Sequence, residues 1–412
     1  MNILMFTNTF TPHVGGVARS VERFTKVMRQ RGHRVVVVAP EFEGQPERER
    51  DVVRVPAIQR FNGSDFSLSL PVFFLDNLVN SEFQPDVVHA HHPYLLGDTA
   101  LRYSAKVDRP LIFTHHTMYE QYTHYVPGDS PILKRFVVEL STGFANMCHH
   151  VIAPSHSVAE VLRERGVETP IKVIPTGVEV SKFTHGDGAT FREKRGIPRQ
   201  AYVIGHLGRL AQEKNLDFLT RAVVRYLLRD PNSHFLVVGD GPSRESMTET
   251  ARDAGVGERL HFTGSLTGQD VVDAYHAMDV FAFASKSETQ GMVLTEAMAA
   301  GVPVIAIEAP GASDVVRDGE NGRLLPEEDE EAFEEAIQWT RDVSEEKRAE
   351  MRKAIEGTLR EFSLEACVEK ALLLYEETLA QKTAGHKFHE QGWDGILRRM
   401  DREIGRASGR ER

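Results

Sequence analysis

Residues 2–40, "NILMFTNTFTPHVGGVARSVERFTKVMRQRGHRVVVVAP", carry the pattern from which the expected fold follows. The run "NILMF" is short and apolar, as in a buried strand, and a turn-rich loop follows it. "RVVVVAP" (34–40) is a continuous β-branched run, which is typical of a strand covered on both faces of a parallel sheet. Between them a helix is expected over 18–31, where apolar residues recur at helical spacing: Val21, Phe24, Val27 and Met28.

The alternation of strands and helices continues along the chain. Further strands are expected in "DVVHAH" (86–91), "PLIFTHH" (110–116) and "HVIAPS" (150–155). After residues 173–182 the pattern starts again with "AYVIGHLGRL" and "HFLVVGDGP", and later "DVFAFAS" and "VPVIAI". Strands separated by helices over short connections predict parallel, doubly wound sheets. We therefore expect an α/β fold of two Rossmann-like domains that face a cleft, where such sheets bind ligands.

The expected domains cover 1–175 and 176–375. A helical extension over 376–412 is expected to cross back to the first domain, and its end, "IGRASGRER", is expected to be disordered. With 412 residues the chain is long enough for two hydrophobic cores.

The composition, with 41 % hydrophobic and 26 % charged residues, is that of a soluble globular protein. No window approaches the roughly 18 apolar residues of a membrane span, and the N-terminus lacks the features of a signal peptide. Two cysteines, Cys148 and Cys367, imply no disulfide framework and fit a reducing cytoplasm. The expected location is therefore the cytoplasm, with peripheral contact to the inner face of the cell membrane left open.

The net charge of −11 makes the protein a poor binder of nucleic acid, so no nucleic-acid partner is expected. Basic charge is nevertheless concentrated in 19–34, and we expect this segment to contact an acceptor or an anionic membrane. The alternative is a helix that covers the sheet and whose outer side is basic. The residues of this segment that we expect to make the contact are Arg19, Arg23, Lys26 and Arg29.

Three loops that follow expected strands carry candidate binding residues. Gly15 and Gly16 precede a helix, where a bare backbone can approach an anion, although an ordinary strand-to-helix turn has the same pattern. Arg209 and Lys214 follow a strand and are expected to clamp a diphosphate. A solvated surface pair is the alternative for these two cations.

The third loop lies in "SETQGMVLTEAMAAGVPVIA" (285–304). Gly291 precedes a helix whose first amides would face a phosphate, and Glu288 could accept hydrogen bonds from hydroxyl groups. Glu296 falls in the second turn of that helix, on an apolar side where a carboxylate needs hydrogen bonds. A surface acid is the alternative reading of Glu296.

Histidines are frequent in the first domain, notably in "HAHH" (89–92) and "THHT" (114–117). A His-x-His pair on a strand, without a third ligand at a recognisable interval, favours hydrogen-bonded histidines at strand ends over a zinc site. The chain contains no Asp-x-Asp, so no metal site is expected.

Taken together, the Gly-Gly loop, the "HHT" strand end, "GRLAQEKN" and Glu-x7-Glu followed by "EAMAAGVPVIA" resemble the retaining glycosyltransferases of family 4, which have the GT-B fold. The similarity covers nearly the whole chain. The stretches "THHTMYEQYTHYVP" and "SETQGM" are most similar to bacterial diacylglycerol glucosyltransferases and related glycolipid synthases. The resemblance implies an acceptor-side first domain and a second domain that binds a nucleotide sugar.

The resemblance also implies a role for each matching residue. His116, Arg209, Lys214 and Glu288 would act in catalysis, His116 and Glu288 at the sugar and the two cations at the diphosphate. Glu296 would hold the ribose. The residues implied to bind the nucleotide sugar are Gly15, Gly16, Arg209, Lys214, Glu288, Gln290, Gly291, Met292, Val293, Leu294 and Glu296.

Transfer with retention, in which the departing phosphate oxygen deprotonates the acceptor hydroxyl, is the mechanism that the resemblance implies. It needs neither cofactor nor metal. UDP-glucose is the expected donor and a membrane lipid such as diacylglycerol the expected acceptor. The alternatives are a GDP-mannose-dependent enzyme with a lipid-linked acceptor, a transferase with a soluble acceptor, and a nucleotide-sugar epimerase or binder on the same fold.

Overall fold

The computed structural model describes all residues except 14, 60–66, 70–82, 122–129, 287 and 382–412. The chain divides into two units, one formed by Met1–Pro175 with the segment that begins at Cys367, and the other by Thr176–Ala366. From the sequence, the divisions were expected after residues 175 and 375. The expected disordered end, residues 404–412, and residues 122–127 of the "THHTMYEQYTHYVP" stretch lie outside the described residues.

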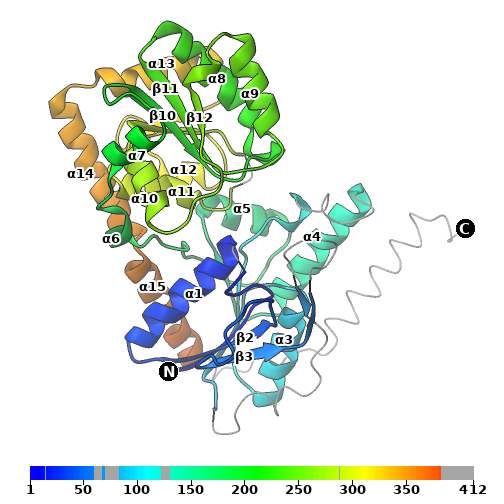
Figure 1. Cartoon of the computed structure of the whole chain (residues 1–412). Helices are drawn as coiled ribbons and strands as arrows, with labels where there is room; N and C mark the ends of the chain where they lie inside the picture. Colours follow the sequence, from blue (N-terminus) through cyan, green and yellow to red (C-terminus); the bar gives the residue numbers. More distant parts are fainter. Residues whose placement is uncertain (14, 60–66, 70–82, 122–129, 287, 382–412) are drawn as a thin grey trace, which may run out of the picture. The chain divides into compact units, whose positions relative to one another are not determined.

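The first unit is built on a seven-stranded parallel sheet in the order β3-β2-β1-β6-β7-β8-β9 (Figure 1). A separate antiparallel pair joins β4 and β5. The elements of this unit are β1 Asn2–Phe6, α1 Gly16–Gln30, β2 Arg34–Pro40, β3 Val52–Val55, β4 Ala57–Ile58, β5 Leu68–Ser69, β6 Val87–Ala90, α3 Leu96–Val107, β7 Leu111–Thr114, η2 Tyr119–Gln121, α4 Pro131–Asn146, β8 His150–Ala153, α5 His156–Glu164, β9 Ile171–Val173 and α15 Leu364–Gln381, whose first turn precedes the division at Cys367.

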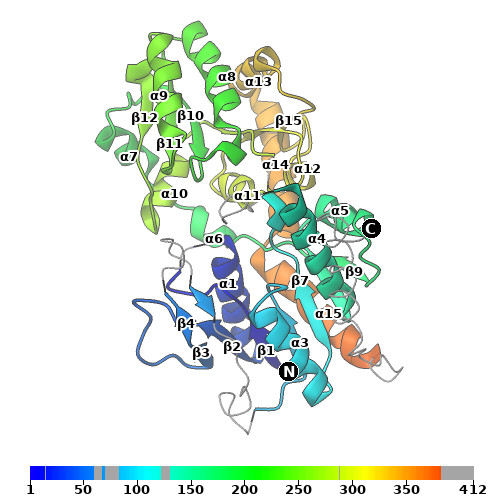
Figure 2. The same ribbon diagram turned by 90° about the vertical axis from the view of Figure 1, so that its right-hand side faces the viewer.

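Helices cover both faces of this sheet (Figure 2). Side chains of β1 alternate between the two faces. Leu4 and Phe6 pack in the core that includes Leu96 of α3, whereas Met5 faces the opposite side, where Thr25 of α1 contacts its sulfur at 3.5 Å. The four apolar residues that predicted the helix over 18–31 are all buried, so the predicted face of α1 is confirmed.

The second unit contains a six-stranded parallel sheet in the order β12-β11-β10-β13-β14-β15. Its elements are α6 Val180–Phe183, α7 Gly188–Lys194, β10 Tyr202–Leu207, η4 Gln212–Lys214, α8 Leu216–Arg229, β11 Ser233–Val238, α9 Arg244–Asp253, η5 Gly257–Arg259, β12 Leu260–Phe262, α10 Gln269–His276, β13 Val280–Phe283, α11 Met292–Ala299, β14 Val304–Ile307, α12 Ala312–Val315, β15 Gly322–Leu325, α13 Glu330–Asp342 and α14 Glu345–Glu361. The predicted pair of Rossmann-like parallel sheets is therefore confirmed.

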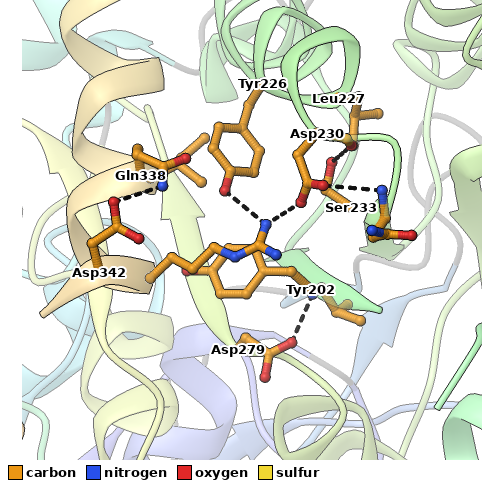
Figure 3. Close-up of polar contacts among 12 residues, drawn as sticks. Tyr202, Tyr226, Leu227, Asp230, Ser233, Asp279, Gln338 and Asp342 are labelled. Atoms are coloured by element: carbon orange, nitrogen blue, oxygen red, sulfur yellow. Dashed lines mark hydrogen bonds and ion pairs between the residues drawn. The ribbon is translucent and has the colours of Figure 1, made fainter. Parts of the chain in front are cut away.

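A polar cluster ties α13 to α8 and β10 in the second unit (Figure 3). Arg341, in the last turn of α13, pairs with Asp230 at the end of α8 and donates to the Tyr226 hydroxyl at 3.3 Å. Its guanidinium carbon lies 5.2 Å from the ring centroid of Tyr202. Planar guanidinium groups stack well on aromatic rings, so this one side chain fastens three elements.

In each sheet the strand order reverses direction once, between β1 and β6 in the first unit and between β10 and β13 in the second. The loops that leave the carboxyl ends of the strands on either side of a reversal diverge, and the opening between them is where doubly wound sheets bind ligands. Each unit therefore positions its own candidate residues at such a reversal.

Candidate functional site

Lys214 and Glu288, two residues of the expected diphosphate and sugar site, meet in the second unit. Lys214 ends η4, after β10, and Glu288 lies in the loop between β13 and α11. The Lys214 ammonium and the Glu288 carboxylate form an ion pair, with 17 % and 22 % of their side chains exposed. The pair bridges the loops at the reversal in strand order. Arg209 is exposed in the same loop as Lys214.

His206, on β10, is close enough to this pair to feel both of its charges, and sequence reasoning missed it. Its Nδ1 donates to the Ala282 carbonyl at 3.1 Å, and its ring stacks on Phe281. Burial lowers the pKa of His206 to about 4, with Lys214 lowering it further and Glu288 acting in the opposite sense. A neutral histidine thus lies near a charged pair. The pattern of "GHLGRL" predicts a strand, and nothing in it marks this histidine.

Glu296 is buried on α11, with 8 % of the residue exposed. Its Oε2 accepts a hydrogen bond from the Tyr275 hydroxyl at 3.1 Å. The surface-acid alternative is therefore wrong for Glu296. Burial, together with the Glu296 carboxylate, raises the pKa of Tyr275 well above its usual value, so the phenol remains a donor. Tyr275 comes from α10, and sequence spacing could not have paired it with Glu296.

The loop before α11 is held by close backbone packing. Gly291 caps α11 with φ +69°, and Gly311 has φ +78°. A Cβ on Gly311 would lie 2.6 Å from the Gln290 backbone nitrogen. Only glycine therefore fits at position 311, where the two loops pack against each other. Gln290 is buried, and its Oε1 accepts from the Thr176 backbone N–H at 2.5 Å.

Three further residues that were expected to bind the nucleotide sugar lie at the start of α11. Met292 and Val293 are partly buried at the start of the helix. The Leu294 side chain is fully buried in the core, so only its backbone could contact a ligand. Gly291 and the start of α11 thus lie where the sequence predicted a helix start, and their contact with a phosphate stays a prediction.

In the first unit, Gly15 caps α1 with an extended backbone, and Gly16 is the first residue of this helix. A Cβ on Gly15 would lie 3.0 Å from Nε2 of His13, whereas a Cβ on Gly16 would meet no atom within 4 Å. Among the described residues, the position of a Gly16 Cβ is therefore unoccupied, which leaves room for the expected close approach of a ligand.

His116 is partly buried and contacts a group of buried histidines in the first unit. Its Nε2 lies 2.9 Å from Nδ1 of His91. His89 contacts the Tyr375 hydroxyl at 2.6 Å and Thr114 at 2.7 Å. Burial lowers the pKa of His89 to about 3 and holds those of His91 and His116 well below the usual value. These rings are neutral and hydrogen-bonded, as expected for strand-end histidines.

The basic segment of α1 is only partly available at the surface. Arg19 and Lys26 are exposed. Arg23 is buried, and the Arg29 guanidinium donates to the carbonyls of Val35, at 2.7 Å, and Asp51, at 2.9 Å. Arg23 is thus buried against expectation and the Arg29 guanidinium is engaged by two backbone carbonyls, so Arg19 and Lys26 are the exposed ones of the four expected cations. Contact of this segment with an acceptor or a membrane stays a prediction.

Lys26 and Arg29 nevertheless line a cavity of about 500 Å³ beside α1. Both signs of charge surround it. The lining residues are Phe10, Thr11, Glu22, Thr25, Lys26, Arg29, Glu49, Arg50 and Val52.

Within the described part of the chain, no group of three or more His, Cys, Asp or Glu side chains is arranged to hold a metal ion. Over the same residues, no helix is both long enough and apolar enough to cross a bilayer.

Comparison with known proteins identifies the family. The family model of Glycosyltransferase Family 4 matches residues 14–182, and that of Glycosyl transferases group 1 matches 187–357. The alpha-monoglucosyldiacylglycerol synthase of Streptococcus pneumoniae is 28 % identical over 398 residues, which cover 93 % of this chain and 90 % of that protein. The GDP-mannose-dependent alpha-mannosyltransferase of Mycobacterium tuberculosis is 30 % identical over 337 residues, covering 79 % and 84 %.

The fold is shared with solved structures. The Anabaena protein HepE in complex with UDP superimposes with a TM-score of 0.72 at 20 % identity, over 92 % of this chain and 100 % of that one. With the two family matches in chain order, the resemblance inferred from the sequence motifs is confirmed. The chain belongs to the family 4 glycosyltransferases and is an enzyme of the GT-B fold.

Proposed function

We propose that this glycosyltransferase, which uses a nucleotide sugar, transfers glucose from UDP-glucose to a hydroxyl of a diacylglycerol-type lipid, with retention of the anomeric configuration. The contact between Lys214 and Glu288 at the strand reversal of the second sheet carries the donor half of this proposal. The names of the relatives from Streptococcus pneumoniae and Acholeplasma laidlawii, both alpha-monoglucosyldiacylglycerol synthases, support the lipid half.

The ion pair suits a donor that carries both a diphosphate and a hydroxylated sugar. When the donor binds, Lys214 turns toward the diphosphate, together with Arg209, and neutralises the leaving group. Glu288 is then released to accept hydrogen bonds from sugar hydroxyls. The ion pair keeps two partly buried charges paired, and in this proposal the donor's groups replace each partner in turn.

The remainder of the donor would lie along α11. Glu296 accepts from the ribose hydroxyls while Tyr275 holds one of its oxygens in place. The amides of Gln290, Gly291 and Met292 support the phosphates through the positive end of the helix. In the first unit, the backbone of Gly15 and Gly16 would lie close to the donor phosphates.

Retention follows, in this proposal, from a reaction on one face of the sugar. The bond from the anomeric carbon to the phosphate oxygen breaks, the acceptor hydroxyl attacks from the same side, and its proton passes to the departing phosphate oxygen. No side chain acts as a nucleophile. His116 hydrogen-bonds the donor sugar, and catalysis comes from electrostatic stabilisation of the leaving group.

Contact with an anionic membrane would bring the acceptor to the enzyme. Arg19 and Lys26 are exposed on α1, and Lys26 also borders the cavity beside this helix. On α4, Ile132 is 61 % exposed next to the exposed Lys134 and Arg135. Exposed apolar and basic side chains on one helix favour a lipid surface.

A second candidate, transfer of mannose from GDP-mannose, is favoured by the 30 % identity to the Mycobacterium tuberculosis mannosyltransferase. A donor screen separates the two. UDP-glucose and GDP-mannose are each incubated with diacylglycerol vesicles and without acceptor, and nucleotide release and the anomer of the product are measured. Acceptor-dependent release of UDP with an α-linked product is expected. Turnover with GDP-mannose alone, or release that does not depend on the lipid, would refute the glucosyl-lipid proposal.

A further inference from the structure

His91 and His116 are joined end to end. They follow β6 and β7, which are neighbours in the first sheet, with His89 opposite Ile112 in the register. Nδ1 of His91 lies 2.9 Å from Nε2 of His116, the ring planes differ by 25°, and the centroids are 5.2 Å apart. This is the separation that two nearly coplanar imidazoles have when a straight hydrogen bond connects them. One nitrogen must therefore carry the proton and the other must accept it.

The other nitrogen of His91 decides which ring donates. Nε2 of His91 is buried and has no hydrogen-bond partner among the described residues. A buried N–H without an acceptor is rarer in proteins than an acceptor that lacks a donor. The proton of neutral His91 therefore belongs on Nδ1, where it is donated to Nε2 of His116. The proton of His116 is consequently on its own Nδ1.

The rings around this pair hold it in place and keep it neutral. The His89 ring lies 4.2 Å from that of His91, and His89 is itself anchored by Tyr375 of α15 and Thr114 of β7. The charged or titratable groups that act on His91 and His116 are other histidines: His89, His92 and His115. No carboxylate is in that set, and the hydrogen bond between the two rings contributes to their orientation.

We propose that His91 is a positioning residue, which fixes His116 as the Nδ1–H tautomer so that His116 offers a hydrogen-bond donor, and not an acceptor, to an oxygen of the donor sugar. This inference rests on the proposed function, in which His116 contacts that sugar. His91 itself does not touch the substrate. Its effect passes through one hydrogen bond.

The tautomer is tested by NMR of the full-length protein labelled with ¹⁵N-histidine. Long-range ¹H–¹⁵N spectra distinguish Nδ1–H from Nε2–H imidazoles, and the signals of His116 are assigned by their loss in His116→Gln. A protonated Nδ1 in His116 is expected. A protonated Nε2 would overturn the inference, whatever the protein's activity, because this readout does not involve turnover.

The functional consequence is tested with two replacements of His91. His91→Asn places an amide N–H near the position of the imidazole Nδ1, whereas His91→Leu fills the space without a donor. His91→Leu is expected to lower kcat roughly 10-fold or more with little change in donor KM, and His91→Asn to recover most of it. Equal kcat in wild type and His91→Leu, or equal losses in both variants, would overturn the positioning role.

The two proposals fail separately. If wild-type enzyme transfers no sugar from any nucleotide sugar to lipid, the proposed function fails, while the tautomer measurement is unaffected. Far-UV circular dichroism and thermal unfolding of both His91 variants show whether a loss of kcat accompanies a loss of structure. Should His91→Leu be unfolded, His91→Gln, which also carries an amide donor on a longer side chain, replaces it and is expected to lower kcat by misplacing that donor.

Discussion

The Lys214 ammonium and the Glu288 carboxylate form an ion pair between residues 74 positions apart in the chain. The contact exists because β10 and β13 are adjacent in the second sheet and their following loops meet at its carboxyl edge. It places a cation and an anion side by side, and these are the charges that the proposed donor needs for its diphosphate and its polyhydroxyl ring.

Replacing Lys214 by alanine should abolish most transfer. The variant loses the cation that neutralises the leaving group, which costs on the order of 2–4 kcal/mol of transition-state stabilisation. We expect kcat/KM for the nucleotide sugar to fall by roughly 100-fold or more while the fold is retained. Steady-state kinetics with UDP-glucose measures the change. Lys286→Ala is the matched control, because Lys286 is an exposed lysine near the same loop and pairs with Glu328. Near-normal activity of Lys214→Ala would contradict the diphosphate clamp.

Glu296→Gln should weaken nucleotide binding without unfolding the protein. The amide keeps the size of the side chain but loses the charge that would accept from two ribose hydroxyls. Charge-assisted hydrogen bonds contribute about 1.5–3 kcal/mol, so we expect UDP to bind roughly 10- to 100-fold more weakly. Isothermal titration calorimetry with UDP measures this affinity. Glu245→Gln, on the exposed side of α9, serves as a control. An unchanged dissociation constant would remove Glu296 from the ribose site.

Gly311→Ala should damage the donor loop more than an equivalent change at Gly301. Both glycines have a positive φ, +78° and +77°, so an alanine at either position costs about 1 kcal/mol of backbone strain. At Gly301 the new methyl group meets no atom within 4 Å, whereas at Gly311 it lies 2.6 Å from the Gln290 backbone. We therefore expect Gly301→Ala to lower stability alone and Gly311→Ala to lower UDP affinity as well.

The Gly311 comparison is made by thermal unfolding with and without saturating UDP. A bound ligand raises the unfolding temperature according to its affinity. The increase should persist in Gly301→Ala and shrink in Gly311→Ala. An identical increase in both variants would show that the loop beside Gln290 does not determine nucleotide binding.

Binding to anionic vesicles should depend on Arg19 and Lys26 rather than on Arg23 and Arg29. Exposed basic side chains contribute about 1 kcal/mol each near an anionic surface, so the double variant Arg19→Gln/Lys26→Gln should bind roughly 10-fold more weakly or worse. Sedimentation with phosphatidylglycerol vesicles measures the partition. Arg221→Gln/Arg225→Gln removes two basic charges from α8 of the second unit and should have no effect. Undiminished sedimentation of the α1 variant would exclude this contact.

The buried histidines predict a loss of stability in acid. The pKa of His206 is about 4 in the folded protein and 6.5 ordinarily. Between these values the unfolded chain binds a proton that the folded chain does not. The free energy of unfolding therefore has its full value above pH 6.5 and falls as the pH drops toward 4. Each such histidine contributes a slope of about 1.4 kcal/mol per pH unit.

His206→Asn tests this slope, because the asparagine amide can still donate to the Ala282 carbonyl but does not titrate. Urea unfolding of both proteins is followed from about pH 7 to about pH 5. Above pH 6.5 the difference in the free energy of unfolding between wild type and variant should be nearly constant, and below it the slope should approach about 1.4 kcal/mol per pH unit, since all other groups cancel. A difference that is constant with pH would mean that His206 is not neutralised by burial.

Much of the architecture could be predicted from the sequence. Continuous β-branched runs such as 34–40 cannot be stable unless both faces are covered, and helical spacing in 18–31 defines one buried side. The loops with candidate residues were found in the same way, since they follow strands. Glycines before a helix and a carboxylate on an apolar helix side are local patterns that spacing alone reveals.

The contacts within the site depended on the tertiary structure. Strand order pairs Lys214 with Glu288 and His91 with His116, and no local pattern specifies which strands become neighbours. Packing likewise buried Arg23, and a helix distant in sequence brought Tyr275 to Glu296. Local patterns act over a few residues, so the sequence by itself determined the elements and the residue types at their ends. Which of those side chains touch was decided only when the sheets assembled, because a hydrogen bond or ion pair depends on separation in space.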